Sequence, residues 1–200
     1  MASRSLVLGL CLLLGALGNQ ILVVVVAPQA VPTIASVNAP LDFPDAIRPV
    51  ENPVADATPL RLVIPSIHLD ARVESRGLTR SHNLDTALDY HDVAWYDLGP
   101  KPGEPGNALI NGHVNWWTGS AVFTYLARVR AGDLVQVIRR DGSSATFKVT
   151  AKRVVDAGAR IASLFAPSPV STLTLITCTG PWDASRQSDT ERLLVSAVLV

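Results

Sequence analysis

One cysteine of this chain has the character of a reactive thiol. Cys178 ends the apolar run 171–178, and the only other cysteine, Cys11, lies inside an N-terminal hydrophobic segment. If that segment enters a membrane, Cys178 has no disulfide partner on its own side. An odd thiol in an exported domain is accidental, paired between chains, or kept for its reactivity. The positions of His113 and Arg192 in the sequence favour reactivity.

Cys178, His113 and Arg192 together have the residue types that acyl transfer from an amide requires. Cysteine attacks as the thiolate, a free thiol has a pKa of about 8.5, and a nearby cation stabilises the anion. The departing amine needs a proton donor, which histidine provides near neutral pH. The developing oxyanion needs a positive or hydrogen-bonding group. The alternatives are an inert core cysteine, a structural histidine and an ordinary surface arginine.

His113 is set apart from the other histidines by the sequence that precedes it. It follows the apolar segment Ala108–Asn111 and a glycine, so it lies at the end of a predicted strand. A strand end is a good place for a catalytic group, because the strand fixes it and the loop leaves it accessible. The remaining histidines lie in polar, turn-like sequence: His68, His82 and His91.

The C-terminal part of the chain, 60–200, is dominated by short β-rich segments. Strands are predicted at Leu60–Ile64, Ala108–Asn111, Leu134–Ile138, Ala145–Val155, Thr172–Cys178 and Leu193–Val200. Asp141-Gly142 between the third and fourth predicts a hairpin turn. Helical patterns are short, at Ala121–Arg130 and Ala159–Phe165. Several short strands with Gly/Pro turns favour an all-β fold, either a closed barrel or a sandwich.

Strand alternation gives the expected orientation of the nucleophile. It places Thr174, Ile176 and Cys178 on one side of their strand and Leu173, Leu175 and Thr177 on the other. Both sides are largely apolar, which predicts a central strand. We expect this strand to end at Cys178, where Thr179-Gly180-Pro181 breaks the pattern, and we expect Arg192 to begin the last strand.

The N-terminal residues predict an anchored, exported domain. Residues 5–27 carry no charge and are long enough to span a bilayer, and Arg4 favours a cytoplasmic N-terminus for residues 1–4. A cleaved signal peptide is the alternative. Residues 28–59 contain seven prolines and predict an extended linker before the domain at 60–200. Lys and Arg balance Asp and Glu, 17 against 17, so nothing indicates a nucleic-acid surface.

Several motifs in sequence order resemble the sortase family. Thr174–Cys178 matches the sortase signature Thr-Leu-x-Thr-Cys, 111–113 matches its Gly-His element, and 192–197 is similar to its arginine-led final strand. The segment 62–67 resembles the usual opening of the domain, so the resemblance covers all of 60–200. The segment 179–183 looks most like the class F type, within a class F or class E resemblance.

The resemblance implies a fold and a set of roles. The fold would be the sortase closed β-barrel with short helices. Cys178 would attack the substrate, His113 would protonate the leaving amine, and Arg192 would contact the substrate carbonyl or oxyanion. Thr177 would contact the substrate or the oxyanion. One departure is Asn115, which stands where the class F pattern often has an aspartate two residues after the histidine.

The resemblance also implies an activity and partners. We expect a membrane-anchored cysteine transpeptidase that cleaves an LPXTG-like C-terminal sorting motif of surface proteins through a thioester. It would pass the protein to an amine, either a cell-wall precursor or a pilin lysine.

Trp116 and Trp117 are candidate substrate-groove residues, with ordinary loop packing as the alternative. No metal ligand cluster is visible, and no cofactor is expected. The other functions left open are a hydrolytic cysteine peptidase and a non-catalytic β-barrel that binds peptides or wall polymers.

Overall fold

The computed structural model describes residues 56–200. The predicted membrane segment 5–27 and most of the predicted linker 28–59 lie outside the described residues. Within 56–200, no helix has the length and apolar character needed to cross a membrane.

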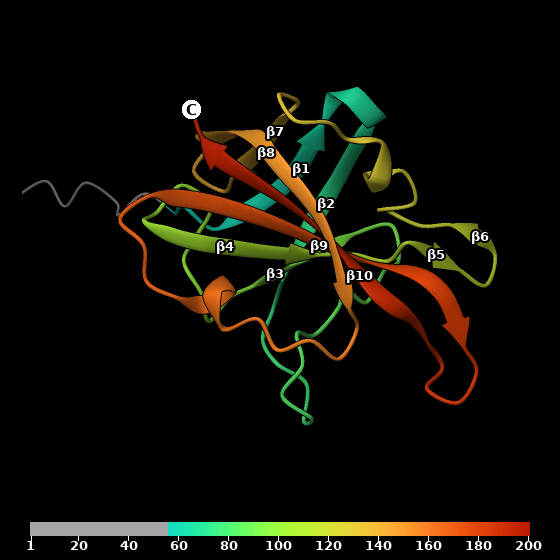
Figure 1. Cartoon of the computed structure of the whole chain (residues 1–200). Helices are drawn as coiled ribbons and strands as arrows, with labels where there is room; N and C mark the ends of the chain where they lie inside the picture. The colour runs from blue at the N-terminus through green and yellow to red at the C-terminus, as the bar shows by residue number, and fades with distance from the viewer. Residues whose placement is uncertain (1–55) are drawn as a thin grey trace, which may run out of the picture. The chain divides into compact units, whose positions relative to one another are not determined.

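Ten strands and three short 3₁₀ helices make up the domain (Figure 1). In chain order they are β1 (Pro59–Ile64), η2 (Pro65–Ile67), β2 (Leu69–Arg76), β3 (Val93–Tyr96), β4 (Gly106–Asn111), β5 (Asn115–Trp116), β6 (Gly119–Ser120), η3 (Leu126–Arg128), β7 (Leu134–Arg139), β8 (Ser144–Asp156), η4 (Ala162–Phe165), β9 (Ser171–Asp183) and β10 (Ser188–Leu199).

Eight of these strands close into one barrel, in the order β1-β2-β3-β4-β9-β10-β8-β7, and β7 pairs back to β1. The β2–β3 and β4–β9 pairs are parallel, and the other pairs are antiparallel. Closure pairs every strand on both sides, so no barrel edge is left open to association. The all-β closed barrel is therefore confirmed, and the sandwich alternative is wrong.

The barrel interior is a single apolar core. Phe123 and Phe147 are its largest fully buried side chains, and Leu173 and Leu175 on β9 are also fully buried. Burying a side chain of this size contributes about 1.5–3 kcal/mol. The predicted β7–β8 hairpin is present, and Gly142 in its turn has a φ of 82°, a backbone conformation that glycine adopts without strain.

The longer helical pattern predicted at Ala121–Arg130 is wrong. The segment forms turns and only the 3₁₀ helix η3, with i to i+3 hydrogen bonds such as Leu126 N–H to Phe123 O at 3.0 Å. Its buried residues Phe123, Leu126 and Val129 are spaced by three, which suits the 3₁₀ period better than the 3.6 of an α-helix. The second helical pattern, predicted at Ala159–Phe165, forms only the short 3₁₀ helix η4.

Two predicted strand limits are also wrong. β9 does not end at Cys178 but continues to Asp183, and β10 begins at Ser188, before Arg192. The register shifts between Asp189 and Glu191, opposite Gly180-Pro181. A bulge of this kind accommodates a proline within a strand, so the break in the sequence pattern does not end the pairing. β9 lies between β4 and β10, as a central strand should.

Candidate active site

The register of β9 and β10 places Arg192 directly opposite Cys178. Leu173 and Leu175 are buried in the core and Thr177 is 4% exposed, so these three side chains point inward. Because side chains alternate along a strand, Cys178 faces outward. Residues directly opposite in an antiparallel pair share one face, so Arg192 lies beside Cys178 on the outside of the barrel.

The Arg192 guanidinium is held by its own end of β10. Its Nη1 donates to the carbonyls of Asp189 at 2.9 Å and Glu191 at 2.8 Å, and its Nη2 donates to the Ser188 hydroxyl at 2.9 Å. Arg192 is half-buried, as is Cys178. The guanidinium is therefore fixed next to the thiol, and none of these three acceptors is a carboxylate.

His113 lies just beyond β4, in a backbone segment tied to two neighbours. The Gly112 N–H donates to the Ile176 carbonyl at 3.1 Å, and the Thr177 hydroxyl donates to the Gly112 carbonyl at 2.8 Å. On the other side, the Phe123 N–H donates to the His113 carbonyl at 2.8 Å. β4 and β9 are parallel neighbours, as Figure 1 shows, and their register pairs Asn111 with Ile176. His113 and Cys178 each follow two residues later, so both lie toward the same end of this strand pair.

Thr177 connects the strand of the nucleophile to the loop of the histidine. Its side chain is buried, and its hydroxyl donates a hydrogen bond to the Gly112 carbonyl. This hydrogen bond ties the strand of Cys178 to the residue just before His113. Direct contact of Thr177 with substrate stays a prediction.

Gly112 is required by close packing at this point. A Cβ there would lie 2.7 Å from Val122 Cγ1 and 2.8 Å from Phe123 Cδ2. We expect Gly112→Ala to cost about 1–3 kcal/mol of unfolding free energy through overpacking, and to displace the adjacent His113.

Urea unfolding and peptide turnover measure these two effects. The matched control is Gly77→Ala, where a Cβ meets only Asp97 Oδ1 at 3.7 Å. Equal stability of the two alanine variants would contradict this account of Gly112.

The two titrating groups favour their neutral forms. Burial raises the pKa of the Cys178 thiol above its ordinary value; the charge of Arg192 acts to lower this pKa, and the charge of Asp189 acts to raise it. Burial lowers the pKa of His113 below its ordinary 6.5, while a hydrogen bond with the Ala87 backbone acts in the opposite direction. Near neutral pH the resting pair is therefore a thiol and an uncharged imidazole.

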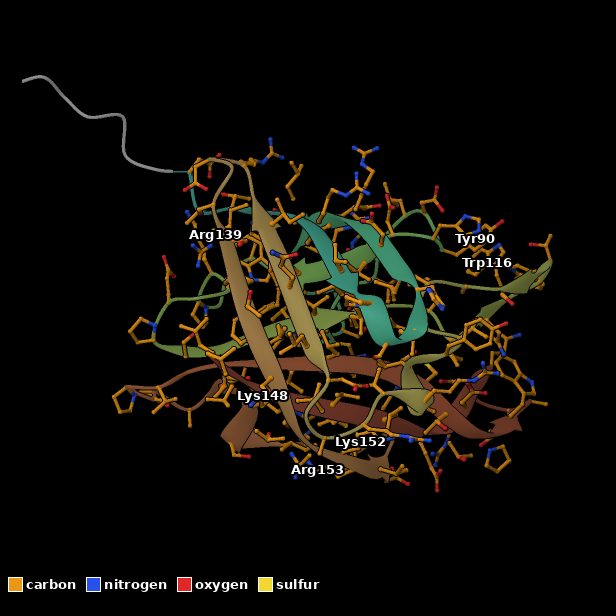
Figure 2. The ribbon with its side chains drawn as sticks, turned by 90° about the horizontal axis from the view of Figure 1, so that it is seen from above. Tyr90, Trp116, Arg139, Lys148, Lys152 and Arg153 are labelled. Carbon is orange, nitrogen blue, oxygen red and sulfur yellow. The ribbon has the colours of Figure 1, made fainter. Side chains whose placement is uncertain are left out.

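Both predicted tryptophans lie in an aromatic cluster that reaches His113. The rings of Trp116 and His113 meet at 65°, with centroids 5.1 Å apart. Trp116 also stacks on Tyr90, with centroids 5.3 Å apart and planes 6° apart, and Trp117 stands at 89° to Trp116. Figure 2 shows Tyr90 and Trp116 together at one end of the domain, away from Arg139 on β7.

Several residues of the site could not be predicted from the sequence. Tyr90 lies in the 77–92 connection, and only the tertiary fold brings it to Trp116. Ala87 acts through its backbone, which no side-chain pattern reveals. Ser188 belongs to the polar run before Arg192, and a hydroxyl four residues from an arginine is too common to indicate a contact.

Two pockets of the described residues have volumes of about 600 and 350 Å³. One lies beside His68 and Arg128, and the other lies beside Tyr96 and Phe165. Neither is lined by Cys178, which faces outward from the barrel wall. Among residues 56–200, no group of three or more His, Cys, Asp or Glu side chains is placed to hold a metal ion.

A family model described as the sortase domain matches residues 62–200. The chain belongs to the sortase family.

No curated protein matched in a sequence comparison. A lid mutant of sortase A from Corynebacterium diphtheriae is 26% identical, with a TM-score of 0.56, over 72% of this chain and 70% of that chain. Sortase C-1 from Actinomyces oris is 25% identical, with a TM-score of 0.56, over 70% and 72%.

A third structure shows how widely the fold is shared. Sortase C1 from Streptococcus agalactiae is 21% identical, with a TM-score of 0.55, over 70% of this chain and 66% of that chain, and at this identity the likeness concerns the fold alone. Sortases are cysteine transpeptidases, so family membership supports a sortase-type transpeptidase activity for the barrel. The roles of individual residues, the substrates and the subclass go beyond this family assignment.

Proposed function

We propose that this sortase cleaves a C-terminal sorting motif through a thioester on Cys178 and transfers the protein to an amine. The observation that carries the proposal is the β9–β10 register, which places a fixed guanidinium directly opposite an outward-facing thiol. The Thr177–Gly112 hydrogen bond, which ties the His113 loop to the same strand, supports it further.

In the first half-reaction Cys178 transfers its proton to His113 as the sulfur attacks the scissile carbonyl. Arg192 stabilises the oxyanion of the tetrahedral intermediate, where its charge has most effect. His113 then gives the proton to the departing amine, and the thioester forms. Both groups are neutral near pH 7, so the reactive thiolate forms by transfer of one proton from Cys178 to His113.

In the second half-reaction an amine attacks the thioester and releases Cys178. The proposed partners are surface proteins bearing an LPXTG-like signal and an amine acceptor, a cell-wall precursor or a pilin lysine. The 179–183 segment supports placement with the class F or class E type. Asn115 supplies no carboxylate to His113, in contrast to the aspartate that the class F pattern often has there.

We also propose that the domain is held at the outer face of the cell membrane by a single span at 5–27. The support is the uncharged sequence of that segment and the proline-rich linker after it. Full-length protein should sediment with membranes after carbonate washing. Mature protein in the medium, cut near Ala30, would favour a cleaved signal instead.

Product analysis tests the proposed transfer. Full-length protein is incubated with LPXTG and Leu-Ala-x-Thr-Gly peptides, with and without a glycine-peptide amine, and the products are identified by mass. We expect an amide product that replaces hydrolysis as the amine concentration rises. Hydrolysis alone at every amine concentration would indicate the peptidase alternative, and no cleavage would indicate a binding protein.

A further inference from the structure

We propose that Tyr90, Trp116 and Trp117, here called the aromatic platform, form the subsite that receives the ammonium group of the acceptor. The inference rests on the proposed function, because it assigns a place to the second substrate of the same reaction. It adds a recognition chemistry, cation–π contact, and the residues that provide it.

The platform has open aromatic surface arranged as a corner. Trp116 is 38% exposed and Trp117 is 91% exposed, and their planes stand at 89° with ring centroids 6.2 Å apart. Two rings at right angles form two walls of the cage that proteins use for organic cations. Tyr90 stacks on Trp116 and sets the orientation of that wall.

Backbone hydrogen bonds hold the platform against the histidine. The Val122 N–H donates to the Tyr90 carbonyl at 2.9 Å, and the next residue, Phe123, donates to the His113 carbonyl at 2.8 Å. Two consecutive N–H donors thus hold the backbone of Tyr90 and of His113, which are two of the three aromatic neighbours of Trp116. The β5–β6 hairpin, which begins two residues after His113, carries the tryptophans.

The location fits the amine and not the acyl part of the substrate. His113 protonates the leaving amine in the first half-reaction, so that amine departs beside the imidazole. The acceptor amine attacks the same carbonyl carbon from the same side, and His113 then acts as a base. Trp116 contacts His113 and lies next to the place where each amine must pass.

Charge around the platform also favours a cation. Asp89 and Asp92 flank Tyr90 and His91 in sequence, and Asp89 lies 3.4 Å from the His91 imidazole. Burial, together with the charges of Asp89 and Glu74, raises the pKa of Asp92, which shows that these carboxylates share one region. Two arginines offset part of this charge: Arg72, which acts on Asp92, and Arg76, which pairs with Glu74 at 3.2 Å.

The transfer step balances with the platform in this role. The bound R–NH₃⁺ gives one proton to neutral His113, and the free amine attacks the thioester carbonyl. The carbon–sulfur bond breaks as the amide forms, and the second nitrogen proton ends on the Cys178 sulfur. His113 releases its proton to solvent. One ammonium and one thioester therefore give one amide, one thiol and one proton.

Binding is tested first, without any need for turnover. The full chain carrying Cys178→Ala, in detergent solution with ¹⁵N-labelled indoles, is titrated with glycylglycine amide and with its N-acetylated form. We expect the Trp116 and Trp117 indole N–H resonances to shift with the ammonium form only. Trp95, buried and bonded to the Pro100 carbonyl, and exposed Trp182 are the internal references. Equal shifts with the acetylated peptide, or equal shifts of Trp182, overturn the proposal.

Kinetics then separates recognition of the cation from a purely structural role. We expect Trp116→Ala to raise the KM for glycylglycine amide about 3- to 30-fold more than it raises the KM for hydroxylamine, the range of a lost cation–π contact. Hydroxylamine is largely uncharged at neutral pH and needs no cation site. Trp116→Phe, which keeps a ring, should fall between wild type and alanine.

The matched control is Tyr125→Ala, an exposed aromatic residue beside Arg128, which should resemble wild type. Equal losses with both nucleophiles, or none with either, overturn the proposal. If no sorting peptide acylates the wild-type protein, the proposed transfer fails, and the titration alone decides whether the platform binds ammonium groups.

Discussion

Cys178→Ala is expected to abolish peptide cleavage, by roughly 10⁴-fold or more, the scale of losing a covalent nucleophile. Cys178 faces outward from β9 and its neighbours in the core are unchanged, so the variant should keep the barrel. Turnover of a sorting peptide is measured beside near- and far-UV circular dichroism.

Cys178→Ser is the companion variant, because it keeps a side chain of similar size and removes only the thiolate chemistry. Both variants should retain substrate binding and lose acylation. Residual turnover near the wild-type rate in either folded variant would show that Cys178 is not the nucleophile.

His113→Ala should lower single-turnover acylation by at least about 10²-fold, the usual loss for a general acid–base group. In wild type, kcat/KM should follow a broad bell. Below the lowered pKa of His113 the thiol and the imidazolium are both protonated, and above the raised pKa of Cys178 both groups are deprotonated. Between these limits a constant minority of the pair is the reactive thiolate–imidazolium.

The acid limb should therefore lie below the ordinary histidine value, and it should disappear in His113→Ala. His82→Asn is the matched control, because His82 is exposed and asparagine tolerates its φ of 60°. Wild-type acylation in folded His113→Ala would mean that another histidine is the acid.

Arg192 is the third residue of the proposed site, beside Cys178 and His113. The two terminal nitrogens of its guanidinium donate hydrogen bonds to Asp189, Glu191 and Ser188 at the same time. This arrangement requires the planar, forked shape of the guanidinium. A lysine supplies only a point charge, so its ammonium would not be held opposite Cys178 in the same way.

Local sequence patterns predicted the elements that depend on local physics. The Leu60–Ile64 strand ends at Pro65, and the β7–β8 hairpin follows its Asp-Gly turn. The alternation along Thr172–Cys178 grouped Leu173, Leu175 and Thr177 on one side, and all three are buried.

Pairing between strands that are distant in the sequence was harder to predict. β2 was not predicted, although Leu69, Ala71 and Val73 alternate with charged residues, and its partner β3 pairs with it in parallel. Parallel neighbours are joined by long connections, so no turn signal marks them.

The candidate site shows the same division. Cys178, His113 and Arg192 were found from residue type and motif order, but their arrangement depends on the β9–β10 register and the β4–β9 pairing. The bulge opposite Gly180-Pro181 could not be seen in one strand alone, because it is a property of two. Tyr90 reaches Trp116 only through the fold.

The most direct test of the central claim is the intact mass of the protein after reaction with a sorting peptide. In the absence of an amine acceptor, the full chain should gain the mass of the acyl fragment on Cys178, as an adduct that hydroxylamine removes. The same adduct should be absent from Cys178→Ala. An adduct located on another residue, or peptide cleavage with no adduct under rapid quench, would contradict the thioester mechanism.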